Sequence, residues 1–235
     1  MSRLLKSSGS VGAATLISRL LGFAREAAYA GFMGVGPVAD AFYFANTVPN
    51  LMRRLLGEGA LTAAIIPIFK DRERHQGDAV MWRSVNAVLS ALILLLGAFV
   101  ALGMLTLTGL IVLAPLTLDQ QLIARLMLVM FPYVAFVCVA AVFIGLLNAR
   151  GHYFVPALGA AVLNVVMIAS VYLLAPRFGA TLKQQIFGLA VGIVVAGFLQ
   201  AAVQLPVMRR EGFRFAWVNP FRDPTVREVA VRMGP

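Results

Sequence analysis

Residues 84–118 contain no Asp, Glu, Lys or Arg. A helix that crosses the hydrocarbon core of a bilayer needs about 20 consecutive apolar residues, so this stretch is long enough to span a membrane. The whole chain has the same character, because 60% of its residues are hydrophobic and 13% are charged. An average soluble domain carries about 25% charged residues. The sequence therefore predicts an all-α polytopic membrane protein.

Six membrane spans are expected where charges are absent or sparse. They cover approximately residues 11–33, 41–69, 84–118, 126–149, 153–175 and 184–208. Pro49 interrupts the second span and Pro132 lies near the start of the fourth, so kinks are expected at both prolines. The sequence also suggests a fragment of a longer transporter. Its expected parts are a six-span bundle at 1–206, a cytoplasmic basic loop at 207–226 and the start of a seventh span at 227–235.

Basic residues alternate between successive loops. The N-terminus and the loops after spans two, four and six contain Arg3, Lys6, Lys70, Arg72, Arg74, Arg83, Arg150, Arg209, Arg210, Arg214, Arg222 and Arg227. The opposite loops contribute Arg177 and Lys183. Because Lys and Arg collect in short cytoplasmic loops, the N-terminus is predicted to be cytoplasmic. This topology also explains the net charge of +10, so no nucleic-acid partner is expected.

Metal and disulfide chemistry are not expected. Cys138 is the one cysteine of the chain, and it lies inside an apolar run. His75 and His152 are far apart in sequence, which argues against a shared metal site. The sequence accordingly predicts no metal and no bound cofactor.

Several charged residues fall inside the expected spans, where charge is costly. They are Arg19, Arg25 and Glu26 in the first span and Arg53, Arg54 and Glu58 in the second. Insertion scales assign about 2.5–3.5 kcal/mol to one arginine at a span centre, so four would cost about 10–14 kcal/mol facing lipid. They are therefore expected to face a wet cavity, to pair with acids or to reach the interface.

Helical spacing groups the polar residues of the second span. Asn46, Asn50, Arg54 and Glu58 recur every four residues and form one stripe, with Arg53 beside it. Arginines on different helices can grip a pyrophosphate, because each guanidinium matches phosphate oxygens bidentately. The cavity is thus expected to bind an anion.

Structural alternatives exist for some of these residues. Arg53 and Arg54 could be held by Glu58 or Asp40, and Arg19 could extend to the cytoplasmic interface. Asp40 is expected at the head of the second span, either as an N-cap or as a ligand.

Other polar and small residues in the spans are expected to serve packing. Gly188 and Gly192 form a small-xxx-small pair typical of close helix contacts. The isolated carboxamides are expected to make interhelical hydrogen bonds; they are Asn148, Asn164, Gln200 and Gln204.

The first two expected spans contain five characteristic segments, which are Ser18-Arg19-Leu20-Leu21-Gly22-Phe23-Ala24-Arg25-Glu26, Ala39-Asp40-Ala41-Phe42, Val48-Pro49-Asn50-Leu51-Met52-Arg53-Arg54-Leu55, Glu58-Gly59-Ala60 and Ile66-Pro67. These segments resemble the MurJ (MviN) family of lipid II flippases. Their spacing also matches the family. The resemblance implies the multidrug/oligosaccharidyl-lipid/polysaccharide (MOP) exporter fold, of which this chain would be the first six-helix bundle and the start of span seven.

The same resemblance implies a function in cell wall biogenesis. The protein would move lipid II, the undecaprenyl-pyrophosphate-linked peptidoglycan precursor, to the periplasmic leaflet of the bacterial inner membrane. The positions of Arg19, Arg25, Arg53 and Glu26 correspond to cavity residues of the family. Supporting or gating positions correspond to Ser18, Asp40, Asn50, Arg54 and Glu58. The membrane potential or a cation gradient is expected to drive transport, and other cell wall synthesis proteins are possible partners.

Four other functions are alternatives to lipid II transport. A flippase for another polyprenyl-pyrophosphate glycan would use the same chemistry. A MATE-like drug/cation antiporter would need a dominant acidic cavity residue instead of arginines. A polyprenyl-pyrophosphate phosphatase would need a nucleophile or acid–base pair, and both histidines fall in expected cytoplasmic loops. A membrane scaffold would leave the cost of the buried charges unexplained.

Overall fold

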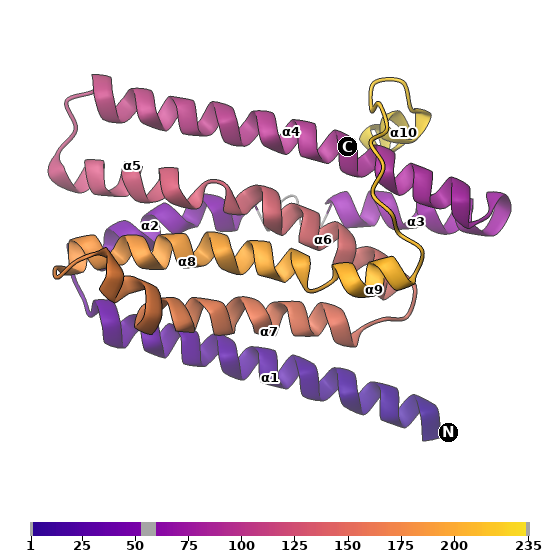
Figure 1. The fold of residues 1–235 in the computed structure, drawn as a ribbon, viewed down its shortest axis with the longest axis horizontal. Coiled ribbons are helices and arrows are strands. Elements are labelled where there is room, and N and C mark those ends of the chain that lie inside the picture. Colours follow the sequence, from indigo (N-terminus) through magenta and orange to yellow (C-terminus); the bar gives the residue numbers. More distant parts are fainter. Residues whose placement is uncertain (1, 53–59, 234–235) are drawn as a thin grey trace.

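The computed structural model describes residues 2–52 and 60–233, and within these ranges the chain forms helices and no strand (Figure 1). The helices are α1 (Ser2–Met33), α2 (Pro37–Met52), α3 (Ala60–Gln76), α4 (Asp78–Leu113), α5 (Leu118–Met130), α6 (Tyr133–Ala149), α7 (Phe154–Ala169), α8 (Leu182–Ala202), α9 (Leu205–Arg210) and α10 (Pro224–Met233). A π-helical turn, η2 (Ser170–Leu174), and a 3₁₀ turn, η3 (Ala175–Phe178), continue α7.

The long helices lie side by side in a bundle (Figure 1). Helix α1 packs against α7, α7 packs against α8, and α8 packs against both α5 and α6. Helix α2 packs mainly on α5, and α4 packs on α3, α5 and α6. Helix α8 therefore lies at the centre of the bundle, whereas α1 and α4 lie at opposite edges (Figure 1).

Four helical segments in the described part of the chain are long and apolar enough to cross a membrane. They cover Asp78–Leu113, Leu118–Ala149, Phe154–Phe178 and Leu182–Arg210. The prediction of a multi-pass membrane protein is thus confirmed. The count of six spans stays a prediction, because α1 is not among these segments and residues 53–59 of the expected second span lie outside the described residues.

The fourth expected span begins earlier than predicted. Helix α5 begins at Leu118 because Thr117 and Gln120 form a capping box. The backbone N–H of Gln120 donates to Thr117 Oγ1 (3.3 Å), and that of Thr117 donates to Gln120 Oε1 (3.0 Å). The expected kink is present, because Pro132 separates α5 from α6.

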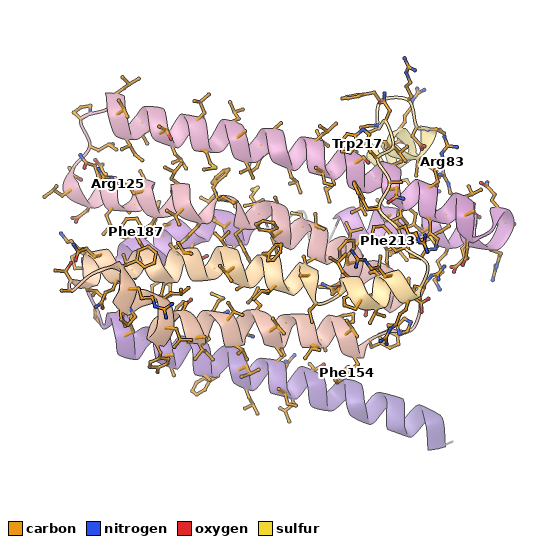
Figure 2. All side chains as sticks on the ribbon, viewed as in Figure 1. Arg83, Arg125, Phe154, Phe187, Phe213 and Trp217 are labelled. Carbon is orange, nitrogen blue, oxygen red and sulfur yellow. The ribbon has the colours of Figure 1, made fainter. Side chains whose placement is uncertain are left out.

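The count of basic residues on the less basic side was one too low. Arg125 falls between the expected spans at 84–118 and 126–149, and in the structure it lies within α5, near the end of the bundle that is opposite α9 and α10 (Figure 2). That end therefore carries three basic residues, Arg125, Arg177 and Lys183. The other end remains much richer in Lys and Arg.

Three of the basic loops meet at one end of the bundle around Arg150. Its Nη2 lies 2.9 Å from Glu73 Oε1 and 3.3 Å from Asp78 Oδ1, and its Nη1 lies 3.0 Å from Glu211 Oε2. The guanidinium also stacks over the ring of Trp82, 4.9 Å from its centroid. These contacts join the α3–α4 connection, the α6–α7 connection and the end of α9. The three loops share one side, as the alternation of charge predicts.

Close packing around α8 confirms the role expected for its two glycines. A Cβ on Gly188 would lie 2.6 Å from the Cα of Ala175 in η3. A Cβ on Gly192 would lie 2.3 Å from the Cβ of Ser170 in η2. No side chain fits at either position, so the glycines allow α8 to approach the end of the α7 segment.

Candidate functional site

A cavity of about 590 Å³ lies between α1, α2, α6, α7 and α8. The lining residues are Arg25, Glu26, Tyr29, Phe42, Tyr43, Asn46, Thr47, Asn50, Tyr133, Ala160, Leu163, Asn164, Met167, Ile193 and Gln200. Arg25 and Glu26 are its charged lining residues in the part of the chain that the structure describes. The wall is otherwise made of carboxamides, hydroxyls, aromatic rings and small apolar groups.

Arg25 links α1 to α7 at this cavity. Its Nη1 donates to Asn164 Oδ1 at 3.0 Å, and its Nη2 forms an ion pair with Glu26. The Arg25 side chain is 25% exposed and that of Glu26 is 52% exposed. Among the described residues, the buried Nε of Arg25 has no hydrogen-bond partner. Nη1 also contacts Met167 Sδ at 4.0 Å. The Nε of the guanidinium is therefore an unused donor among the described residues, and one of its partners, Glu26, is an exposed carboxylate that a ligand can displace.

Asn164 is the residue that positions Arg25. It makes interhelical hydrogen bonds between α7 and α1, as expected from the sequence, but it was not predicted as a site residue. Its Nδ2 donates to the backbone oxygens of Ser18 (3.3 Å) and Ala160 (3.1 Å), which turns Oδ1 toward the guanidinium. Ser18 thus takes part through its carbonyl oxygen. The available signal was a single carboxamide in the middle of the apolar run at 153–175.

Helix α2 supplies the polar stripe that its four-residue spacing predicted. Asn46 and Asn50 both line the cavity. The continuation of the stripe, Arg54 and Glu58, lies outside the described residues, as does Arg53. The structure therefore supports half of the stripe and leaves the other half as a prediction.

Two expected site residues lie away from the cavity lining. Arg19 is exposed on α1, about 9 Å along the helix axis from Arg25. Asp40 is exposed in the first turn of α2. The helix begins at Pro37, whose fixed φ suits the first helical position, so the N-cap alternative for Asp40 was wrong.

Most of the other lining residues were not predicted as site residues. The polar ones among them include Tyr29, Tyr43, Thr47, Tyr133 and Gln200. Tyr43 and Thr47 lie near Asn46 and Asn50 on α2, so the face of that helix was the signal that could have found them. Gln200 was expected to bond a neighbouring helix and instead faces the cavity. Gln204, one turn further along, makes the interhelical hydrogen bond that was expected, because its Nε2 donates to Ala140 O on α6 at 3.5 Å.

Helices α1 and α2, together with α6, α7 and α8 of the membrane-capable segments, thus surround a polar cavity that contains an arginine and an exposed carboxylate. This combination defines a multi-pass α-helical membrane protein with an internal polar site. Ionisable groups at such positions typically mark a substrate pathway.

Comparison with known proteins identifies the family. The family model described as "Lipid II flippase MurJ" matches residues 29–235. The chain belongs to the MurJ family, in agreement with the resemblance of its motifs.

Relatives and a solved structure agree with this assignment. A "Probable lipid II flippase MurJ" of Rhizobium tropici is 37% identical over 232 residues, which cover 96% of this chain and 43% of the relative. The "Lipid II flippase MurJ" of Burkholderia cenocepacia is 33% identical, with 96% and 45% covered. A solved "Lipid II flippase MurJ, inward closed conformation" superposes with a TM-score of 0.74 at 21% identity, covering 95% of this chain and 46% of that one. The fold is therefore shared, and the chain spans less than half the length of these relatives.

Proposed function

We propose that the protein to which this chain belongs is a lipid II flippase. Family membership supports the substrate, since the relatives carry that name. The single observation that carries the proposal is the placement of Arg25 in a polar cavity, where its Nε has no partner among the described residues and its partner Glu26 is exposed and replaceable. A guanidinium in this state suits the oxygens of a pyrophosphate.

Arg25 would exchange partners during transport. In the empty cavity its charge is balanced by Glu26 and its orientation is fixed by Asn164. A pyrophosphate that enters the cavity would displace the exposed Glu26 carboxylate, because a pyrophosphate presents more acceptor oxygens to the guanidinium than a carboxylate does. Asn164 would keep the guanidinium aimed at the cavity throughout.

The remaining predicted residues have places in the same scheme. Arg19 and Arg53 would add positive charge along the path of the headgroup. Ser18, Asp40, Asn50, Arg54 and Glu58 would support or gate that path. The cavity would alternate between the two sides by rocking of two bundles, driven by the membrane potential or a cation gradient, and the protein would act as a transporter without enzymatic chemistry.

We further propose that the protein resides in the bacterial inner membrane with its N-terminus in the cytoplasm. The excess of Lys and Arg at the end that contains Arg150 supports this orientation. Labelling of single cysteines with an impermeant maleimide would test it. Arg74→Cys is expected to react only from the cytoplasmic side, and Arg177→Cys only from the periplasmic side. The reverse pattern would contradict the topology.

Complementation of a bacterium depleted of its own lipid II flippase tests the function. The full-length gene would be compared as wild type, Arg25→Ala and Arg125→Ala, at matched membrane expression. Arg125→Ala is the control, because it removes an exposed arginine outside the cavity. Rescue by wild type and Arg125→Ala but not by Arg25→Ala is expected.

The other outcomes are equally informative. Failure of well-expressed wild type would contradict lipid II as the substrate and favour another polyprenyl-pyrophosphate glycan. Rescue by Arg25→Ala would remove Arg25 from the substrate site and leave it a structural link between α1 and α7.

A further inference from the structure

The polar wall of the cavity divides into two chemically different parts. Its charged part, Arg25 and Glu26, comes from α1. Its neutral part contains the carboxamides of Asn46, Asn50, Asn164 and Gln200, which come from α2, α7 and α8. A carboxamide presents both donors and an acceptor, so this part matches hydroxyl and amide groups better than it matches a phosphate.

Some of these polar groups already have structural partners. Asn164 uses Oδ1 for Arg25 and Nδ2 for two backbone oxygens. The hydroxyl of Thr47 donates to Tyr43 O at 2.9 Å. Neither side chain is a good candidate for contact with a ligand. The side chains of Asn46 and Gln200 make no hydrogen bond among the described residues.

Of Asn46 and Gln200, Gln200 gives the stronger indication of a ligand contact. Its residue is 8% exposed and lines the cavity, yet its Oε1 has no partner within the described part of the chain. Buried polar atoms in folded proteins nearly always have a hydrogen-bond partner. The Nε donor of Arg25, which lines the same cavity, also has no partner among the described residues. A ligand that pairs with both atoms carries an acceptor for the Arg25 N–H and a donor for Gln200 Oε1.

We propose that Gln200 and Asn46 form a subsite for the sugar next to the pyrophosphate, which they bind through its hydroxyl and amide groups. The inference rests on the proposed function, in which Arg25 binds the pyrophosphate. An amide N–H or a hydroxyl of the sugar donates to Gln200 Oε1, and the Asn46 carboxamide exchanges hydrogen bonds with neighbouring hydroxyls. The aromatic rings of Tyr43 and Tyr133 complete the pocket, as is usual in sites for organic ligands.

Binding measurements with two lipids separate the subsite from the pyrophosphate site. The full-length protein in nanodiscs would be titrated with lipid II and with undecaprenyl pyrophosphate, which has no sugar. Gln200→Leu removes the carboxamide at similar size, and Asn46→Leu does so on α2. Each is expected to weaken lipid II binding about tenfold, the effect of one lost hydrogen bond with its desolvation, while binding of undecaprenyl pyrophosphate stays unchanged.

Gln204→Leu is the matched control. Gln204 lies one turn further along and is fully buried, and its Oε1 also lacks a partner among the residues that the structure describes, but it does not line the cavity. Its replacement is expected to leave the ratio of the two affinities unchanged. Arg25→Ala is expected to weaken binding of both lipids.

The outcomes distinguish the two proposals. If Gln200→Leu and Asn46→Leu weaken both lipids equally, or neither, the sugar subsite is refuted. If Arg25→Ala leaves both affinities intact while Gln200→Leu weakens lipid II selectively, the pyrophosphate role of Arg25 fails and the sugar subsite stands.

Discussion

Replacement of Gly188 by alanine should separate α8 from η3. The added Cβ would lie 2.6 Å from the Cα and 2.7 Å from the N of Ala175. Both neighbours are backbone atoms, so no rotation of a side chain can relieve the clash. One of the two segments must shift by roughly 1 Å to restore ordinary contact between carbon atoms at about 3.5–4.0 Å.

The magnitude follows from a matched control. Any glycine-to-alanine change inside a helix also gains about 0.8–1 kcal/mol of helix propensity. Gly97 on α4 provides that gain without a clash, since a Cβ there would meet no atom within 4 Å. The difference between Gly188→Ala and Gly97→Ala therefore isolates the overpacking penalty, about 1–3 kcal/mol for a methyl group forced into a filled site.

The assay is thermal unfolding of the purified full-length protein in one detergent, with the two variants and wild type side by side. Gly188→Ala is expected to melt below Gly97→Ala and below wild type. Equal melting temperatures of the two variants would refute the close contact between α8 and η3, and with it the packing role assigned to Gly188.

Three further predictions follow from other contacts. Asn164→Asp should weaken binding of undecaprenyl pyrophosphate, because a carboxylate at Oδ1 would pair with Arg25 and compete with the ligand; Asn148→Asp, outside the cavity lining, should not, and equal effects in native mass spectrometry would contradict this. Hydrogen bonds from Arg150, then His152, lower the pKa of Glu211 below its ordinary value of 4.5. A carboxyl whose pKa is lowered on folding stabilises the protein above its ordinary pKa and loses that contribution as the pH falls through the lowered pKa. Glu211→Gln should therefore melt below wild type at pH 7, with a gap that closes below about pH 4.5, and a constant gap would argue against the linkage. Arg72→Gln should speed hydrogen exchange in α10, because Arg72 holds that helix through Thr225 and Glu228 (3.1 Å); unchanged exchange there would show that apolar packing suffices.

Local sequence features predicted much of the fold because they act within one segment. The uncharged run at 84–118 favours a membrane-spanning helix whatever packs against it. Pro132 likewise interrupts the helix that contains it, independently of the rest of the fold. The early start of α5 was also within reach, since Thr117 and Gln120 have the spacing of a capping box. The predicted span begins only at residue 126 instead.

The sequence by itself determined that Arg25 and Glu26 need an unusual environment, because charge in an apolar helix is costly wherever that helix packs. The tertiary structure decided what that environment is. Arg25 and Asn164 are 139 positions apart, and they meet because α1 packs along α7. Gln200 reaches the same cavity because α8 lies between α6 and α7. Hydrophobic patterning states which face of a helix avoids water or lipid, but the neighbour of each face depends on the packing of the whole bundle. That dependence is why the charged residues and the stripe of Asn46 and Asn50 could be identified from the sequence, whereas the places of Asn164 and Gln200 beside them could not.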